Sequence, residues 1–164
     1  KIQSNDLIFE DVNNFRANDV LITNDKNIFI SYASSDEKGF LKLKVVKLVN
    51  LNNMYESKLV YQTQSYPPPF GVHQTGGKMA EYDENTILLA VGDFQKGNFI
   101  DDDNNEVGKT LLINKHLNNT KKVFTTGHRN IQGLAYSNFL EKFIATEHGP
   151  QGGDILIQIK EIQT

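Results

Sequence analysis

The sequence predicts an all-β fold, and within that class a β-propeller of four-stranded antiparallel blades. Helical periodicity is nearly absent, the apolar runs are short and rich in β-branched and aromatic residues, and Asn, Asp and Gly bound these runs. Short apolar runs between turn-forming residues are typical of strands. The predicted strands span residues 19–23, 27–33, 41–50, 59–64, 78–82, 86–91, 110–114, 122–125, 133–137, 142–147 and 155–159.

Three similar strand pairs indicate an internal repeat. A tight turn with Asn, Asp or Ser joins each pair, and Asn27, Asn85 and Lys142 take equivalent places, 58 and 57 residues apart. Two further strands follow each of the first two pairs, so a unit has about four strands, as is typical of propeller blades. An ordinary β-sandwich with similar hairpins, acting as a stand-alone adhesion domain, is the alternative.

The length of the chain predicts only part of a propeller. Propellers have about 4–8 blades, whereas three blade-like units, near residues 15–65, 70–126 and 127–164, fill this sequence. An open arc of three blades would leave apolar faces on its end blades exposed. We therefore expect the remainder of the propeller, or another copy of the chain, as a partner.

Composition sets several partner classes and site types aside. The net charge is −3 with both signs interspersed, so no basic stripe predicts nucleic-acid binding. The sequence has no apolar run of about 18 residues, and we expect no membrane span. The residues after Lys1 do not have the pattern of a signal peptide. An exported chain whose signal peptide has been removed would look the same. Because cysteine is absent, disulfides, thiolate catalysis and Cys-based zinc sites are excluded.

Two polar, glycine-bearing loops carry the strongest functional signal. They flank one apolar run, and we expect them at opposite ends of a strand pair. The first loop, in 127–135, offers a guanidinium and two carboxamides; the second, in 146–154, offers two carboxylates and a Gly-Pro turn with free carbonyls. Such a pair of loops could hold an anionic cofactor and a hard cation together.

These loops resemble a known family. Gly-His-Arg-Asn-x-Gln-Gly-Leu-Ala at 127–135 and Thr-Glu-His-Gly-Pro-x-Gly-Gly-Asp at 146–154 are similar to motifs of the soluble quinoprotein sugar dehydrogenases, which include glucose/sorbosone and aldose sugar dehydrogenases. Two more segments fit, a Gly-Gly-Lys-Met strand that leads to Gly-Asp at 76–93, and Gly-Lys-Thr-Leu-Leu-Ile-Asn at 108–114. The match spans roughly residues 70–157 in four ordered motifs.

The resemblance implies a six-bladed propeller with pyrroloquinoline quinone (PQQ) over its central channel and a calcium ion against the quinone. It implies oxidation of a sugar, the small-molecule partner, at its anomeric carbon. A histidine takes the hydroxyl proton while hydride passes to the quinone. It further implies a periplasmic or secreted protein. The lysine and arginine that grip the quinone carboxylates would lie in later blades, outside this chain.

The resemblance also assigns roles to residues of the two loops. Arg129 would contact the quinone oxygens and stabilise the charge that develops on them, since a guanidinium stays charged. Asn130 and Gln132 would donate hydrogen bonds to quinone or sugar. The backbone carbonyls of Gly149 and Pro150 would bind calcium, which accepts main-chain oxygen ligands.

His73 is the candidate general base, because a histidine titrates near neutral pH. It stands one position earlier than the family's histidine, and Gln74 occupies that place. Two other positions depart: Lys78 replaces an arginine, and Ile155 stands where a glutamate is common. These departures favour an alternative, a catalytically inactive propeller that acts as a carbohydrate- or protein-binding scaffold.

Overall fold

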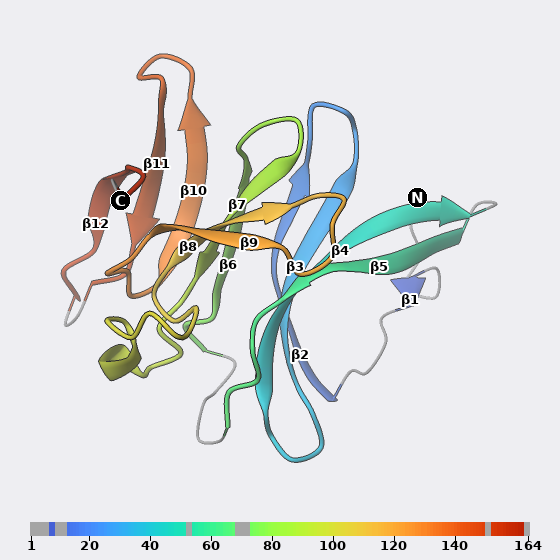
Figure 1. The fold of residues 1–164 in the computed structure, drawn as a ribbon, viewed down its shortest axis with the longest axis horizontal. Helices are drawn as coiled ribbons and strands as arrows, with labels where there is room; N and C mark the ends of the chain where they lie inside the picture. The colour runs from blue at the N-terminus through green and yellow to red at the C-terminus, as the bar shows by residue number, and fades with distance from the viewer. Residues whose placement is uncertain (1–6, 9–12, 52–53, 68–72, 150–151, 163–164) are drawn as a thin grey trace.

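The computed structural model describes residues 7–8, 13–51, 54–67, 73–149 and 152–162. It confirms the all-β prediction: the described residues form twelve strands and one short 3-10 helix, η2 (Gly97–Phe99) (Figure 1). The strands are β1 (Leu7–Ile8), β2 (Asn13–Ile22), β3 (Ile28–Ser35), β4 (Leu41–Leu51), β5 (Met54–Gln62), β6 (Gly76–Glu81), β7 (Thr86–Val91), β8 (Thr110–Asn114), β9 (Lys121–Thr125), β10 (Ile131–Ser137), β11 (Lys142–Glu147) and β12 (Ile155–Ile159).

The strands form three sheets that follow one another along the chain (Figure 1). The first has the order β1-β5-β4-β3-β2, in which β1 pairs parallel to β5 and the other four strands are antiparallel. The second is the antiparallel meander β6-β7-β8-β9, and the third is β10-β11-β12. Sheets of consecutive antiparallel strands are the blades of a propeller, and the third has three strands among the described residues, one fewer than a complete blade.

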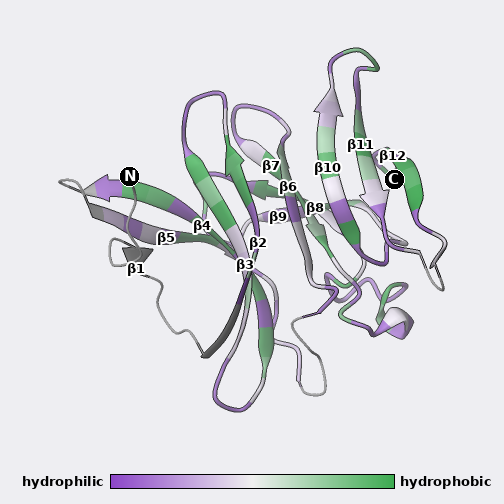
Figure 2. Ribbon diagram, turned by 180° about the vertical axis from the view of Figure 1, so that it is seen from behind, coloured by the Kyte–Doolittle hydropathy of each residue, from purple (hydrophilic) through white to green (hydrophobic). Residues whose placement is uncertain are grey.

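The middle sheet is covered on both faces, which explains its apolar sequence. β7 is buried along Ile87 to Val91, without the alternation of a strand that faces water on one side. Ile87 and Leu89 belong to a core cluster with residues of the first sheet, whereas Leu88 and Ala90 pack with residues of the third. Figure 2 shows hydrophobic stretches within the strands and hydrophilic turns at several of their ends.

Several strand ends differ from the prediction, for local reasons. β2 begins at Asn13 rather than 19, and two register shifts along its pairing with β3 hide the alternation of its first half. β6 begins at Gly76, before a further shift. Gly76 and Gly77 have φ of 68° and 87°, a region that favours glycine, so they read as a turn in the sequence.

None of the helical structure in the described residues is long and apolar enough to cross a membrane.

Candidate functional site

The two motif loops lie at the same end of the β10–β11 hairpin. Ile131, the first residue of β10, pairs with Glu147, the last of β11. The expectation that the loops lie at opposite ends was wrong, because antiparallel pairing brings the start of one strand beside the end of the next. The residues before β10 and after β11 therefore form a single site.

Arg129 is the centre of this site. Its Nη1 donates to the Gly149 carbonyl oxygen at 2.5 Å, and its Nε lies 3.7 Å from Asp93 Oδ2. The Asp93 backbone N–H donates to the Arg129 carbonyl at 2.6 Å. The Arg129 side chain is 34% exposed and that of Asp93 only 6%. A loop of the second sheet thus holds the guanidinium of a residue that precedes the third sheet, and the Arg129 side chain stays partly accessible.

Gln74 completes the support of Arg129. With its amide oriented to satisfy both neighbours, it donates to Asp93 Oδ1 at 2.8 Å and accepts from Arg129 Nη2 at 3.2 Å. Burial raises the pKa of Asp93, although the Gln95 backbone N–H and the charge of Arg129 oppose this shift. The effect of burial on the pKa of Asp93 is therefore larger than the opposing effect of the partly exposed Arg129 guanidinium.

Glu147 organises the backbone of the first loop. Its carboxylate accepts from the Arg129 backbone N–H and lies 3.1 Å from His128 Nδ1. Burial raises the pKa of Glu147, but the hydrogen bonds from His128 and from the backbone of Arg129 and Asn130 prevail and lower it. His128 Nε2 lies 2.6 Å from the Thr125 hydroxyl, which contacts Thr110. This buried chain fixes the loop without reaching solvent.

Asn130 and Gln132 lie together at the start of β10, where Asn130 precedes the strand and Gln132 is its second residue. Asn130 is 5% exposed, and its Oδ1 accepts from the Gly76 backbone N–H at 3.2 Å and from Gln132 Nε2 at 3.0 Å. Asn130 therefore fastens the start of β6 to the start of β10. Among the described residues its Nδ2 has no hydrogen-bond partner, so one donor remains for a ligand.

A small polar hollow of about 50 Å³ adjoins Gln132. It is bordered by β2, by β6 with the two residues before it, and by β10, so residues far apart in sequence meet there. Arg16 and Lys78 give it positive charge. Its lining includes Arg16, Asn18, Gln74, Gly76, Lys78 and Gln132.

His73 lies beside the hollow rather than beside Arg129. It is exposed, and its Nδ1 is 3.5 Å from Arg16 Nη1. Within the described residues it makes no hydrogen bond to Arg129 or Asp93, a position that Gln74 holds instead. Sequence reasoning did not identify Gln74 or Asp93 as site residues. The Gly92-Asp93 motif and the one-residue offset of His73 were the signals that could have found them.

The predicted calcium ligands are only partly described. Gly149 O faces the Arg129 guanidinium, and Pro150 lies outside the described residues. In the described part of the chain, no group of three or more His, Asp or Glu residues is placed to hold a metal ion.

The comparisons with known proteins decide the family. A sequence profile described as glucose/sorbosone dehydrogenase matches residues 18–163. The chain belongs to the glucose/sorbosone dehydrogenase family. A curated relative of this family member, an uncharacterised protein from Synechocystis sp., is 34% identical over 57% of this chain and 28% of its own length.

Solved structures confirm the propeller fold of this glucose/sorbosone dehydrogenase family member. The apo form of the soluble aldose sugar dehydrogenase from Escherichia coli superposes with a TM-score of 0.75 at 18% identity, over 92% of this chain and 48% of that protein. The PQQ-bound form of the aldose sugar dehydrogenase from Streptomyces coelicolor gives 0.59 at 16% identity, over 88% and 60%. The chain thus spans about half the length of these structures.

Proposed function

We propose that this chain supplies one side of the active site of a PQQ-dependent dehydrogenase that oxidises an aldose at its anomeric carbon. The observation that carries the proposal is the mounting of Arg129. Its guanidinium is held by Gly149 O, Asp93 and Gln74, while about a third of the side chain, 34%, stays exposed. A fixed cation of this kind stabilises negative charge as it develops on a bound oxygen.

The donor set fits an anionic quinone. Arg129 and the Nδ2 of Asn130 offer donors for its carbonyl oxygens, and Arg16 and Lys78, which line the hollow, add positive charge. Gln132 Nε2 already donates to Asn130 Oδ1 and to the Ile131 carbonyl. When bound, PQQ supplies a two-electron acceptor. The hollow of about 50 Å³ is too small to enclose it, so the fit rests on the chemistry of the donors.

His73 is the proposed base. It is exposed beside Arg16 at the edge of the hollow, where a neutral imidazole nitrogen could take a proton from a sugar hydroxyl. Arg129 would hold the oxygen that gains charge, and Asp93 and Gln74 would position Arg129.

Calcium fits this arrangement poorly, and we derive no step through it. The one described carbonyl of the predicted pair, Gly149 O, already accepts from a guanidinium at 2.5 Å. A calcium ion bound to the same oxygen would face that positive charge at close range.

The test uses the full-length protein with PQQ, with and without calcium. We expect dye reduction with aldoses and quinone binding by calorimetry, both lost in Arg129→Ala. Absence of both in the wild type would overturn the proposal. We extend it to a periplasmic or secreted location, which cell fractionation would test.

The remainder of the propeller, or a second copy of the chain, would complete the site. Exposed apolar side chains on the third sheet support this, with Leu156 of the edge strand β12 73% exposed. Sedimentation of the 164-residue chain tests it: self-association or insolubility is expected, and a stable folded monomer would contradict it.

A second candidate function is a sugar- or protein-binding propeller without chemistry. The position of Gln74 favours it, because a carboxamide that cannot act as a base contacts both Asp93 and Arg129. Sugar binding by calorimetry, with neither quinone affinity nor turnover, would support this candidate over the enzyme.

A further inference from the structure

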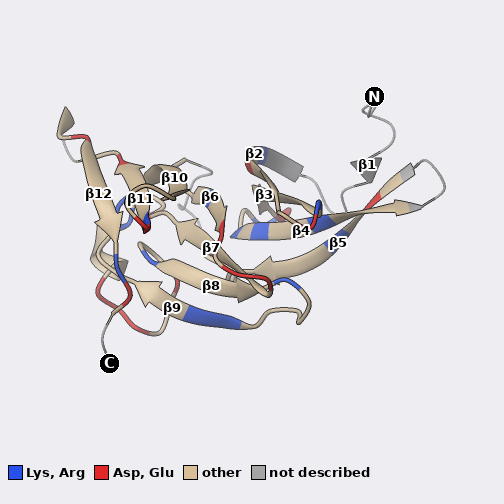
Figure 3. Cartoon of the chain, turned by 90° about the horizontal axis from the view of Figure 1, so that it is seen from above, with Lys and Arg blue, Asp and Glu red and all other residues tan. Residues whose placement is uncertain are grey.

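A second polar cavity lies between the first and second sheets, away from the Arg129 site. Its volume is about 330 Å³, within the range of small-molecule sites. Its lining comes from Lys42 of β4, the end of β5 with residues 63–65, the loop before β8, the β8–β9 turn and Lys121 of β9. None of its lining residues borders the hollow of about 50 Å³ that Arg16 and Gln132 line. Figure 3 marks basic residues on β4 and β9, two strands that contribute to it.

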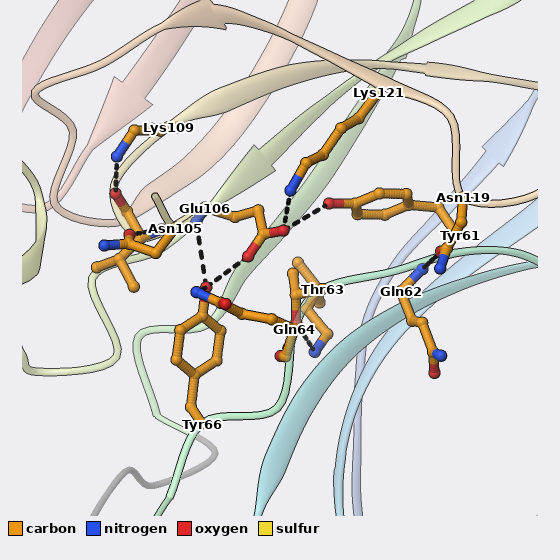
Figure 4. Close-up of polar contacts among 12 residues, drawn as sticks. Tyr61, Gln62, Thr63, Gln64, Tyr66, Asn105, Glu106, Lys109, Asn119 and Lys121 are labelled. Atoms are coloured by element: carbon orange, nitrogen blue, oxygen red, sulfur yellow. Dashed lines mark hydrogen bonds and ion pairs between the residues drawn. The ribbon is translucent and has the colours of Figure 1, made fainter. Parts of the chain in front are cut away.

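A buried carboxylate forms its base. Glu106 is 4% exposed, and its Oε1 accepts from Lys121 Nζ. Tyr66 donates to Oε2 at 2.7 Å and Tyr61 to Oε1 at 3.4 Å. Figure 4 shows Glu106 between the ammonium and the two phenols, which come from segments of both sheets. Burying a carboxylate is costly, and apolar side chains of similar volume often replace such a group without loss of stability.

The two tyrosines remain donors over the physiological pH range. Burial, followed by the negative charge of Glu106, raises the pKa of both Tyr61 and Tyr66 well above the ordinary value. The carboxylate therefore receives three donors from the protein. Because a carboxylate offers about four lone-pair directions, one remains for a hydroxyl of a ligand.

The walls carry polar groups that the protein does not use. In the described part of the chain, neither the Lys42 ammonium nor the Gln62 carboxamide has a partner. Asn119 adopts a φ of 58°, and its Oδ1 accepts from the Gln62 backbone N–H at 2.9 Å, which leaves its Nδ2 free among these residues. Ser65 adds an exposed hydroxyl, and Gln64, whose Nε2 donates to the Tyr66 hydroxyl at 3.5 Å, adds an exposed carboxamide oxygen.

We propose that this cavity binds a sugar acid, a polyhydroxylated ring that carries one carboxylate. Vicinal hydroxyls both donate and accept, which suits a carboxylate flanked by amides and an ammonium. The cavity is lined by two ammonium groups, those of Lys42 and Lys121, and by one carboxylate, that of Glu106, so one positive charge is in excess. Lys121 pairs with Glu106, which leaves Lys42 as the ammonium without a partner among the described residues. The ligand carboxylate pairs with Lys42, and its hydroxyls bond to Glu106 and Asn119. This site is separate from the proposed quinone site and does not depend on it.

Calorimetry on the full-length protein with glucuronate, glucose and acetate tests the proposal. We expect saturable binding of glucuronate, and at least about tenfold weaker binding of glucose, because glucose lacks the carboxylate. Acetate at the same concentration as glucuronate should not compete with it. Lys42→Ala should weaken glucuronate binding about tenfold or more, and Lys58→Ala, which removes an exposed lysine of β5 outside the cavity, should leave it unchanged.

Two further variants separate binding from folding and from the other site. Glu106→Gln should reduce the affinity for glucuronate about tenfold, and circular dichroism checks that the variant is folded. If Glu106→Gln unfolds, Lys42→Ala still tests the proposal, because Lys42 lies outside the buried cluster around Glu106. Arg129→Ala should bind glucuronate normally. The proposal is overturned if glucuronate does not bind, if acetate or glucose binds equally well, if Lys42→Ala binds like the wild type, or if Arg129→Ala abolishes binding.

Discussion

Arg129 donates from Nη1 to the carbonyl oxygen of Gly149 at 2.5 Å, across the open end of the β10–β11 hairpin. The bond joins the loop before β10 to the loop after β11. Because Nε of the same guanidinium lies 3.7 Å from Asp93, the second sheet is joined as well. One side chain therefore ties together three segments that the sequence separates.

Replacing Arg129 should weaken the fold as well as the site. Arg129→Ala leaves the buried Asp93 carboxylate without its cation and should lower the free energy of unfolding by about 1–3 kcal/mol, a range kept low because the guanidinium is partly exposed. Urea unfolding measures the change. Arg129→Lys, which keeps the charge but not the planar fork, should fall between alanine and the wild type. An unchanged midpoint for Arg129→Ala would show that the guanidinium does not support the loops.

The proposed base gives a kinetic prediction. His73→Ala should lower kcat of the quinone-dependent activity by about 100-fold or more, with a small change in KM, because a general base acts in the transition state. Since His73 is exposed, unfolding by urea should be unaffected. His116→Ala, which removes an exposed histidine of the β8–β9 turn, is the matched control. Equal activity of the two variants would remove His73 from the mechanism.

The buried Glu147 predicts a pH dependence of stability. Its pKa in the folded protein is lowered from the ordinary value of 4.5, so its contribution is complete above that value and is lost as pH falls through the lower, folded-state pKa. Glu147→Gln should therefore cost about 1–3 kcal/mol at pH 7, and this difference should shrink below about pH 4.5.

Urea unfolding of Glu147→Gln and the wild type at pH 7, 5, 4 and 3 measures the effect. Glu84→Gln, at an exposed turn between β6 and β7, should unfold like the wild type at pH 7. A difference for Glu147→Gln that stays constant down to pH 3 would contradict the assignment of the shift to Glu147.

The sequence predicted strands best where turn residues bound an apolar run. The bounds of β7, β8, β11 and β12 agree with the prediction. The prediction of strand bounds failed where register shifts interrupt the alternation of apolar and polar residues, as in the first half of β2. It also failed where glycines with positive φ begin β6. Strand β1 was missed, because a two-residue strand carries no period.

The site was predictable where its residues share one motif. Arg129, Asn130 and Gln132 are close because they lie within four consecutive residues at the start of β10, whereas Asp93 and Gln74 reach Arg129 through tertiary contacts. The chain from Thr110 through Thr125 to His128 was also hidden, because threonines are ordinary residues of strands. Partners of this kind follow from packing between sheets, which no spacing in the sequence reveals.

Gly92 is a position where packing between two chain segments leaves no room for a side chain. A Cβ there would lie 1.9 Å from the carbonyl oxygen of Gln74 and 2.7 Å from the backbone nitrogen of Gly76. Both obstacles are backbone atoms, so no side chain can rotate away. The Gly92 N–H also donates to Thr75 O at 3.1 Å, and Phe94 N–H donates to Gln74 O at 3.0 Å, which keeps the two segments in close contact.

Gly92→Ala should therefore lower the free energy of unfolding by about 1–3 kcal/mol or more and weaken quinone binding, because it displaces Gln74 from Asp93 and Arg129. Gly97→Ala is the control: a Cβ at Gly97 meets only Ile100 Cδ1, at 3.9 Å, and should change stability by less than about 0.5 kcal/mol. Thermal and urea unfolding of the two variants measure the difference. Equal stability would mean that the 74–76 and 92–93 segments can separate without loss, and that the support of Arg129 does not depend on their contact.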